Sequence, residues 1–175
     1  MTDLIKERAK AKRLNSPISD LTLAYIAGFV DGEGTLTIMR TPEISGGKRN
    51  HRRAGHRPTV CIANTNIEIL TWIIQTLGVG VVQKSKQRGA NRKQVWKYVV
   101  TSQPAIDIAR ILLPYLRIKR MQAEILLGYG ETIQKTYDSY RTPTRTIVTR
   151  EELTNAVRVL NRRGTDKEES LCQTH

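Results

Sequence analysis

The sequence predicts an α+β fold: one antiparallel four-stranded sheet with helices on one face and a basic surface on the other. Segments with helical and strand periodicity follow one another in the order helix, two strands, helix, two strands, then helices. The chain has a net charge of +13, and this charge is concentrated where the strands are expected. Residues 35–106 contain 12 Lys and Arg residues against two acids, so the basic surface belongs to the sheet.

The first predicted helix begins after a cap at Ser19 or Asp20 and has two different faces. Four small or short side chains recur at offsets of three, four and seven and share one face: Ala24, Ala27, Gly28 and Asp31. A second face carries larger apolar residues: Leu23, Ile26, Phe29 and Val30. The apolar face is expected to pack on the sheet. The small face would allow a second helix to approach closely, as in small-xxx-small helix pairs.

Acids and glycines alternate where this helix ends. Gly32 and Gly34 interrupt the helix, and Asp31 and Glu33 place two carboxylates at its C-terminus. Carboxylates are unfavourable at the negative end of the helix dipole unless a cation is near. The pattern therefore predicts a divalent-metal site, whereas the plain alternative is a helix end with solvated carboxylates.

The remaining elements follow from periodicity and from cap residues. Strands are expected at 35–40, 59–63, 81–86 and 95–101, and further helices at 66–77, 103–113, 120–137 and 149–161. The last helix would begin with a capping box at Thr149–Glu152. We expect an N-terminal extension (1–18), a single domain (19–161) and a polar tail (162–175).

Composition restricts the class of protein and its location. Hydrophobic residues make up 39% and charged residues 26%, and no apolar run is long enough to span a bilayer. The N-terminus has no apolar core typical of a signal peptide, and Cys61 and Cys172 form neither a zinc spacing nor a disulfide framework. We therefore expect a cytoplasmic or organelle-interior protein that binds nucleic acid, with no membrane partner.

The stretch from Leu23 to Gly34, LAYIAGFVDGEG, resembles the motif of the LAGLIDADG homing endonucleases, with conservative replacements. A single copy is present, which is typical of the homodimeric members. The resemblance covers about residues 20–135 and implies an αββαββα core, followed by C-terminal helices, whose curved sheet sits in the DNA major groove.

The resemblance also implies roles for individual residues. Glu33 takes the position of the catalytic metal ligand, often Asp in the family, and the carbonyl of Gly32 assists it. Lys119, in the segment Pro114–Ala123, takes the position of a lysine near the catalytic waters, and Asn64 lies near the family's water-positioning residue, although a helix-cap role explains it equally well. Asp31 would lie in the dimer seam with Ala24, Ala27 and Gly28 and cap the partner helix.

The expected cofactor is Mg²⁺, with Mn²⁺ as a substitute and Ca²⁺ supporting binding without cleavage. One carboxylate per chain is too few for a two-metal site, so two copies are expected to complete it. A twofold dimer would read a long, pseudo-palindromic DNA site.

Residues that face outward from the strands are expected to contact base edges. They are Thr35, Thr37, Met39, Arg57, Thr59, Gln83, Ser85, Lys97 and Thr101. A second basic set is expected to contact phosphates. It comprises Arg40, Arg49, Arg52, Arg53, Arg88, Arg92 and Lys93.

The function these features favour is an intron-encoded homing endonuclease that makes a double-strand break in DNA by metal-dependent hydrolysis. The alternative is an intron RNA maturase, or a non-cleaving DNA-binding protein, on the same scaffold. Intron RNA is therefore a further candidate partner.

Overall fold

The computed structural model describes residues 18–42, 55–86, 93–134 and 144–162, and these residues form nine helices and strands. They are α1 (Asp20–Glu33), β1 (Gly34–Thr41), β2 (Gly55–Asn64), α2 (Ile67–Leu77), β3 (Val81–Lys84), β4 (Trp96–Thr101), α3 (Gln103–Leu112), α4 (Arg120–Gln134) and α5 (Thr144–Leu160). The four strands make one antiparallel sheet in the order β1-β2-β4-β3. The predicted fold class is confirmed. Residues 1–17 of the expected extension (1–18) and residues 163–175 of the expected tail (162–175) lie outside the described residues.

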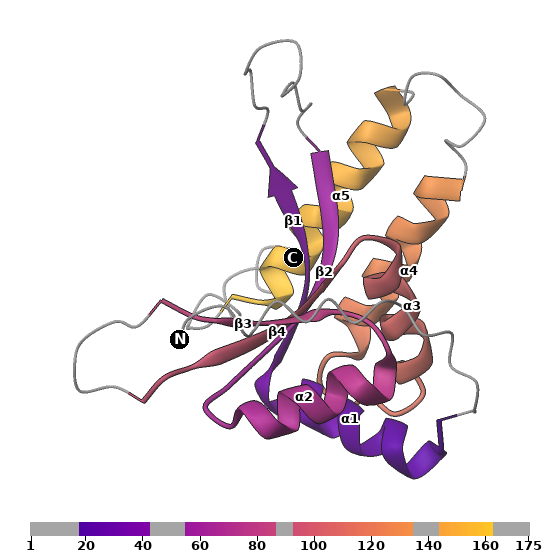
Figure 1. The fold of residues 1–175 in the computed structure, drawn as a ribbon. Coiled ribbons are helices and arrows are strands. Elements are labelled where there is room, and N and C mark those ends of the chain that lie inside the picture. Colours follow the sequence, from indigo (N-terminus) through magenta and orange to yellow (C-terminus); the bar gives the residue numbers. More distant parts are fainter. Residues whose placement is uncertain (1–17, 43–54, 87–92, 135–143, 163–175) are drawn as a thin grey trace, which may run out of the picture.

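The sheet extends as two strand pairs from a shared centre, β1–β2 in one direction and β3–β4 in another (Figure 1). Alternate side chains of three strands face the helices and are buried: Leu36, Ile38, Val60, Ile62, Tyr98 and Val100. These residues join apolar side chains from all five helices in one core. The opposite face of the sheet is left uncovered by the described helices, which is the arrangement a groove-binding sheet requires.

Three helix ends form as the sequence predicts. Ser19 caps α1 by accepting the Thr22 amide, and Asn66 caps α2 by accepting the amides of Glu68 and Ile69. Gly78 ends α2 in the left-handed conformation, with φ 66°.

The predicted start of the last helix is wrong. α5 begins at Thr144, so the expected capping box at Thr149–Glu152 lies inside the helix. Its pattern of Thr followed by Glu three residues later is equally compatible with a helix interior. There Thr154 donates its hydroxyl to the carbonyl of Arg150, four residues earlier. The sequence did not reveal the earlier start because residues 144–148 lack the apolar periodicity of a helix.

The junction between α1 and β1 requires glycine at position 34. The Gly34 amide bonds to the Val30 carbonyl, and the chain passes so close to Val30 that a Cβ on Gly34 would lie 2.6 Å from that carbonyl oxygen and 2.9 Å from the Val30 Cα. Both atoms are backbone and cannot move aside cheaply. The tight junction therefore fixes the end of α1 against the start of β1.

We predict that Gly34→Ala lowers the free energy of unfolding by about 1–3 kcal/mol, the usual cost of an overpacked site. Urea unfolding of the variant and the wild type measures the difference. Gly128→Ala in α4 is the matched control, because a Cβ there meets nothing within 4 Å and should leave stability unchanged or raised. Equal stability of Gly34→Ala and wild type would contradict the account of this junction.

Candidate nucleic-acid interface and metal site

The C-terminus of α1 separates its two carboxylates. Asp31 is 9% exposed, whereas Glu33, the last residue of the helix, is exposed. The next residue, Gly34, already begins β1, so Glu33 projects from the corner where helix and sheet meet.

Asp31 binds the backbone of its own chain. Its Oδ2 accepts the amides of Arg117 at 2.7 Å and Ile118 at 3.2 Å, and its Oδ1 accepts the amide of Lys119 at 2.9 Å. These amides immediately precede α4, which begins at Arg120. Asp31 therefore anchors the turn into α4 of its own chain, and its capping of a partner helix stays a prediction.

The same contact brings Lys119 to the end of α1. Its Nζ donates to the main-chain carbonyl oxygen of Asp31. The carbonyls in the last turn of a helix accept no hydrogen bond from within the helix, so this oxygen is available to Lys119. A cation at the C-terminus of a helix is also favoured by the helix dipole. The predicted pair Lys119 and Glu33 thus belongs to one corner of the molecule, although 86 residues separate them in sequence.

Hard oxygen donors are the metal-binding groups available at this corner. Glu33 offers a carboxylate, and Gly32 lies in the last turn of α1, where carbonyls lack intrahelical partners. Within the described residues, no group of three or more His, Cys, Asp or Glu side chains is arranged to hold a metal ion. One chain therefore supplies a partial donor set, suited to a cation such as Mg²⁺ that keeps several waters and shares substrate phosphate.

Asn64 lies at the same end of the sheet as this corner. Gly34 pairs with Ile62, so the end of β2 at Asn64 extends two residues past the start of β1. The Asn64 Oδ1 accepts the Asn66 amide at 2.8 Å, a turn that leads into α2. The side-chain oxygen of Asn64 is thus already hydrogen-bonded within the chain. The role of Asn64 near the catalytic waters stays a prediction.

The strand register brings most of the predicted base-contacting residues to one face. Thr35, Thr37 and Met39 alternate with the buried residues of β1, and Met39 pairs with Arg57 across the strands. The register continues the same face across β2, β4 and β3 through the pairs Thr37 with Thr59, Thr59 with Thr101, and Gln83 with Lys97. Ser85 follows β3 and bonds through its amide to the carbonyl of Val95.

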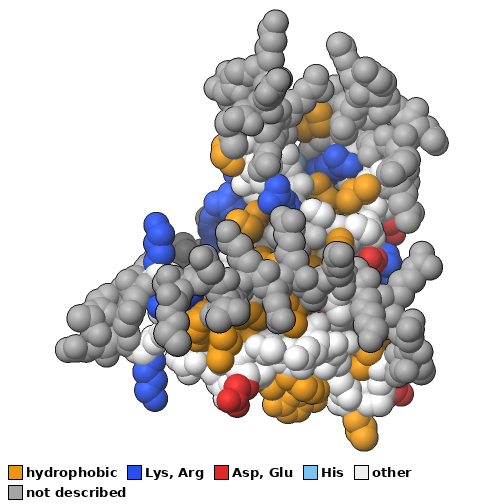
Figure 2. Space-filling model, viewed as in Figure 1, with side chains coloured by type: hydrophobic (Ala, Val, Ile, Leu, Met, Phe, Trp, Pro, Cys, Tyr) orange, Lys and Arg blue, Asp and Glu red, His pale blue; other side chains and the backbone are white. Residues whose placement is uncertain are grey.

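This outer face is basic and partly apolar. Figure 2 shows Lys and Arg side chains gathered along the strand pairs in the view drawn, with few acidic side chains beside them. Met39 is 52% exposed, and Lys97 and Arg57 are half-buried. Burial raises the pKa of the Cys61 thiol on this face, against the opposing effect of Lys97, so the thiol is neutral.

Two predicted DNA contacts differ from expectation. Arg40 lies on the inner face with Leu36 and Ile38, and its guanidinium pairs with Glu151 on α5, so it does not belong to the outer basic face. The side-chain period of two along a strand is the reason. Thr59 lies on the outer side by register but is 2% exposed, with its hydroxyl donating to the Arg57 carbonyl.

Five other predicted phosphate contacts lie outside the described residues: Arg49, Arg52, Arg53, Arg88 and Arg92.

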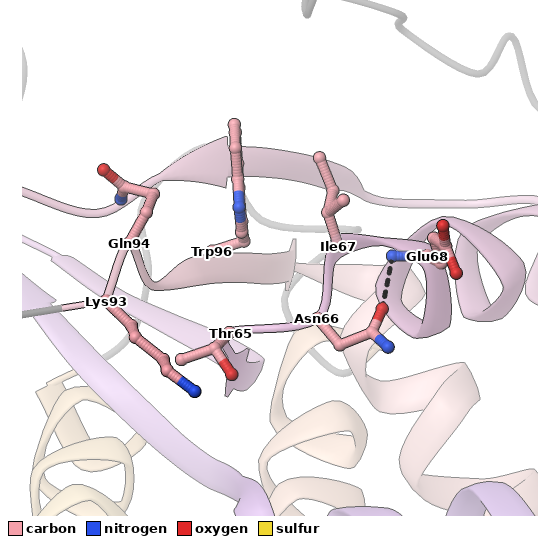
Figure 3. A pocket seen from close by; sticks show the side chains of 7 residues that line it. All are labelled: Thr65, Asn66, Ile67, Glu68, Lys93, Gln94 and Trp96. Atoms are coloured by element: carbon pink, nitrogen blue, oxygen red, sulfur yellow. Dashed lines mark hydrogen bonds between the residues drawn. The ribbon is translucent and has the colours of Figure 1, made fainter.

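Lys93 is exposed and lines a hollow of about 510 Å³ at the N-terminus of α2 (Figure 3). The amides that could attract a phosphate there are already used, because the Asn66 Oδ1 accepts those of Glu68 and Ile69. These two amides are therefore not available to bind an anion in the hollow.

The small-residue face of α1 is rotated from its predicted position. Ala24 and Gly28 are exposed as expected, but Ala27 is fully buried in the core and Asp31 is engaged by the α4 turn. The exposed face instead consists of Leu21, Ala24, Tyr25, Gly28 and Gly32, at offsets of three, four, seven and eleven.

Sequence analysis did not identify two contacts of long range. Tyr25 meets Trp72 of α2 edge to face, with ring centroids 5.6 Å apart. Glu151 of α5 contacts Arg40 and also His56. The only local signal for the contact of Arg40 with Glu151 was that Arg40 has the same strand alternation as the inward-facing Leu36 and Ile38.

The chain was compared with protein-family models, curated sequences and solved structures. No protein-family model and no curated protein sequence matches the chain. Solved structures do match: the homing endonuclease I-CvuI in complex with the I-CreI target, at 25% identity and a TM-score of 0.62, covers 84% of this chain and 85% of its own. A second I-CvuI complex, with its own target, was solved in the presence of Ca.

Two further structures align over most of the chain. The archaeal intron-encoded homing endonuclease I-Vdi141I complexed with DNA has 18% identity, a TM-score of 0.64, and covers 85% of this chain and 89% of its own. The group I intron-encoded I-CeuI complexed with DNA has 11% identity, a TM-score of 0.63, and covers 87% and 72%. The chain has the fold of the LAGLIDADG homing endonucleases, and it carries once a stretch that resembles their motif.

None of the helices in the described residues is long and apolar enough to cross a membrane.

We predict that Asp31→Asn destabilises the fold by about 1–3 kcal/mol, because an amide group presents an N–H donor where backbone N–H groups now find an acceptor. Thermal or urea unfolding measures the loss. Asp107→Asn is the control: this carboxylate is 54% exposed and bonds only surface groups, including Arg110 at 3.1 Å, so its loss should be within about 0.5 kcal/mol. Equal effects of the two substitutions would contradict the role given to Asp31.

Proposed function

We propose that this protein is a sequence-specific DNA endonuclease that acts as a homodimer and hydrolyses one phosphodiester bond in each strand. The observation that carries the proposal is the corner at the end of α1. There an exposed carboxylate, Glu33, lies beside the contact of Lys119, at the edge of a basic sheet face.

The outer face of the sheet is the proposed DNA-binding surface. A two-stranded ribbon fits the major groove, where each base pair offers a distinct set of donors and acceptors. Arg57, Gln83 and Lys97 supply polar contacts from three strands, and Met39 supplies an apolar contact suited to a thymine methyl group. Similarity to endonucleases solved with DNA supports this use of the face.

Glu33 and the carbonyl of Gly32 are the proposed ligands of a divalent metal ion, Mg²⁺ in the cell. The bound ion supplies activation of the attacking water and stabilisation of the leaving oxygen. Lys119, held by the Asp31 carbonyl, offsets the charge that develops on the phosphate. Asn64 orients water through its amide nitrogen, since its oxygen is engaged by Asn66.

A second copy of the chain is proposed to pack on the exposed face of α1. Gly28 and Gly32 lie one turn apart, and a Cβ on either would meet nothing within 4 Å among the described residues. Glycine inside a helix costs about 0.5–1 kcal/mol relative to alanine, and no contact between described residues accounts for that cost. Close approach of another helix does account for the two glycines, and it brings two Glu33 side chains to adjacent phosphates.

The proposed enzyme is a single domain over residues 19–161 that reads a pseudo-palindromic target, with one half-site for each copy. Its similarity to intron-encoded endonucleases supports intron homing as its biological role.

We predict that Glu33→Gln reduces cleavage of the target by at least about 100-fold, because the neutral amide is a poor metal ligand. Binding to the same DNA in Ca²⁺ should remain close to that of the wild type. Strand-resolved cleavage and filter binding measure the two effects. Glu131→Gln, an exposed acid on α4, is the control and should cleave normally. Cleavage by Glu33→Gln at the wild-type rate would rule out Glu33 as the ligand.

Gly28→Leu should raise the dimer dissociation constant at least about tenfold, equivalent to 1.4 kcal/mol, because its side chain blocks close helix contact. Sedimentation equilibrium measures dimerisation, and circular dichroism should show an unchanged fold. Gln75→Leu adds the same side chain to an exposed position of α2 and should leave the dimer intact. A Gly28→Leu protein that dimerises like the wild type would refute the proposed interface.

A further inference from the structure

One carboxylate of α5 joins both strands of the β1–β2 pair. The Arg40 guanidinium donates to Glu151 Oε1, and the His56 Nε2 lies 2.6 Å from Glu151 Oε2. Arg40 also donates to the Asn155 Oδ1 at 2.8 Å, one turn further along α5. Arg40 and His56 are paired across the two strands, so Glu151 contacts both members of one cross-strand pair from the inner side of the sheet. We call the contacts of Glu151 with Arg40 and His56 the clamp.

The clamped pair lies directly behind residues of the proposed DNA surface. Met39 and Arg57 are the adjacent register pair, and they face outward because side chains alternate along a strand. Their backbones are continuous with those of Arg40 and His56. Any shift of the inner pair is therefore transmitted to the outer pair.

Two further contacts attach the same strand pair to the helices. The Tyr129 hydroxyl of α4 donates to the His56 carbonyl at 2.9 Å, and the side-chain Nδ2 of Asn161, just after α5, donates to the Leu36 carbonyl at 2.8 Å. α5 runs along β1 and β2 (Figure 1), so these contacts fix the strand pair at successive points along its length. Glu151 is the contact nearest the end of the described strands.

Fold stability alone does not explain the clamp. The side chains of Arg40 and Glu151 are 45% and 41% exposed, and exposed ion pairs contribute little to the free energy of unfolding. The hydrogen bond with His56 and the charge of Arg40 hold the pKa of the Glu151 carboxyl below its usual value, so it stays ionised at neutral pH. The contacts of Glu151 hold the two strands in one position. Base readout depends on such fixed positions, because a side chain must lie close to its productive geometry.

We propose that Glu151 is a positioning residue for DNA readout, which fixes the end of the β1–β2 pair so that Met39 and Arg57 meet their base pairs in register. This inference rests on the proposed function. It assigns part of the sequence specificity to α5, a helix that lies outside the αββαββα core and contributes no residue to the outer face of the sheet.

The test measures affinity of Glu151→Gln for every single-base-pair variant of the wild-type target, in Ca²⁺. Met39→Ala and Arg57→Gln first define the base pairs that these residues read. At those pairs, Glu151→Gln should lose about tenfold in discrimination, within the usual worth of one base contact. Discrimination at base pairs assigned by Gln83→Ala and Lys97→Gln to the β3–β4 pair should be unchanged. Glu152→Gln, the exposed neighbour on α5, should retain the whole profile.

Arg40→Gln provides an independent arm. If the guanidinium serves the clamp, this variant should reproduce the profile of Glu151→Gln, and the double variant should add nothing further. If Arg40 contacts phosphate instead, affinity should fall for all sequences alike and its salt dependence should weaken. The second outcome overturns the inference.

The outcomes separate the two proposals. A wild-type chain that selects no DNA sequence refutes the proposed function and this inference with it. A wild-type chain with a defined target, whose discrimination at the Met39 and Arg57 base pairs survives Glu151→Gln, refutes the inference alone. A uniform loss at all base pairs also refutes it, because that pattern indicates general destabilisation.

Discussion

The carboxylate of Asp31 joins the end of α1 to the turn that leads into α4. It is part of α1, and it accepts three consecutive amides, those of Arg117, Ile118 and Lys119, at the entrance to α4. The contact satisfies three backbone donors of the turn that leads into α4, and it sets the end of α1 in position. Everything proposed for catalysis depends on that position, because Lys119 and Glu33 are brought to one corner by this contact.

Asp31 also supports our proposal that two copies of the chain act together. Two acids end the motif, but only Glu33 is left exposed, and a single carboxylate does not make a two-metal site. The exposed glycines of α1 support the same proposal from different evidence, since nothing among the described residues requires them. The need for a second carboxylate and the unexplained glycines are both met by a second copy packed on α1.

The fold was largely predictable because its signals are local. Caps such as Asn66 and the glycine at 34 mark helix ends, and the period of two in β1 assigns Leu36 and Ile38 to the core. The contacts that the sequence did not predict join distant segments. No local pattern links Asp31 to residues 117–119. Arg40 was expected to bind phosphate because its charge is visible in the sequence and its partner Glu151 is not.

The most direct test of the account is a selection from random duplex DNA with the purified chain, first in Mg²⁺ and then in Ca²⁺. The account predicts that DNA is cut in Mg²⁺ at an inverted repeat on the order of two helical turns long, and that the same repeat is bound without cutting in Ca²⁺. Binding of a single asymmetric half-site, with no cutting in Mg²⁺, would contradict it.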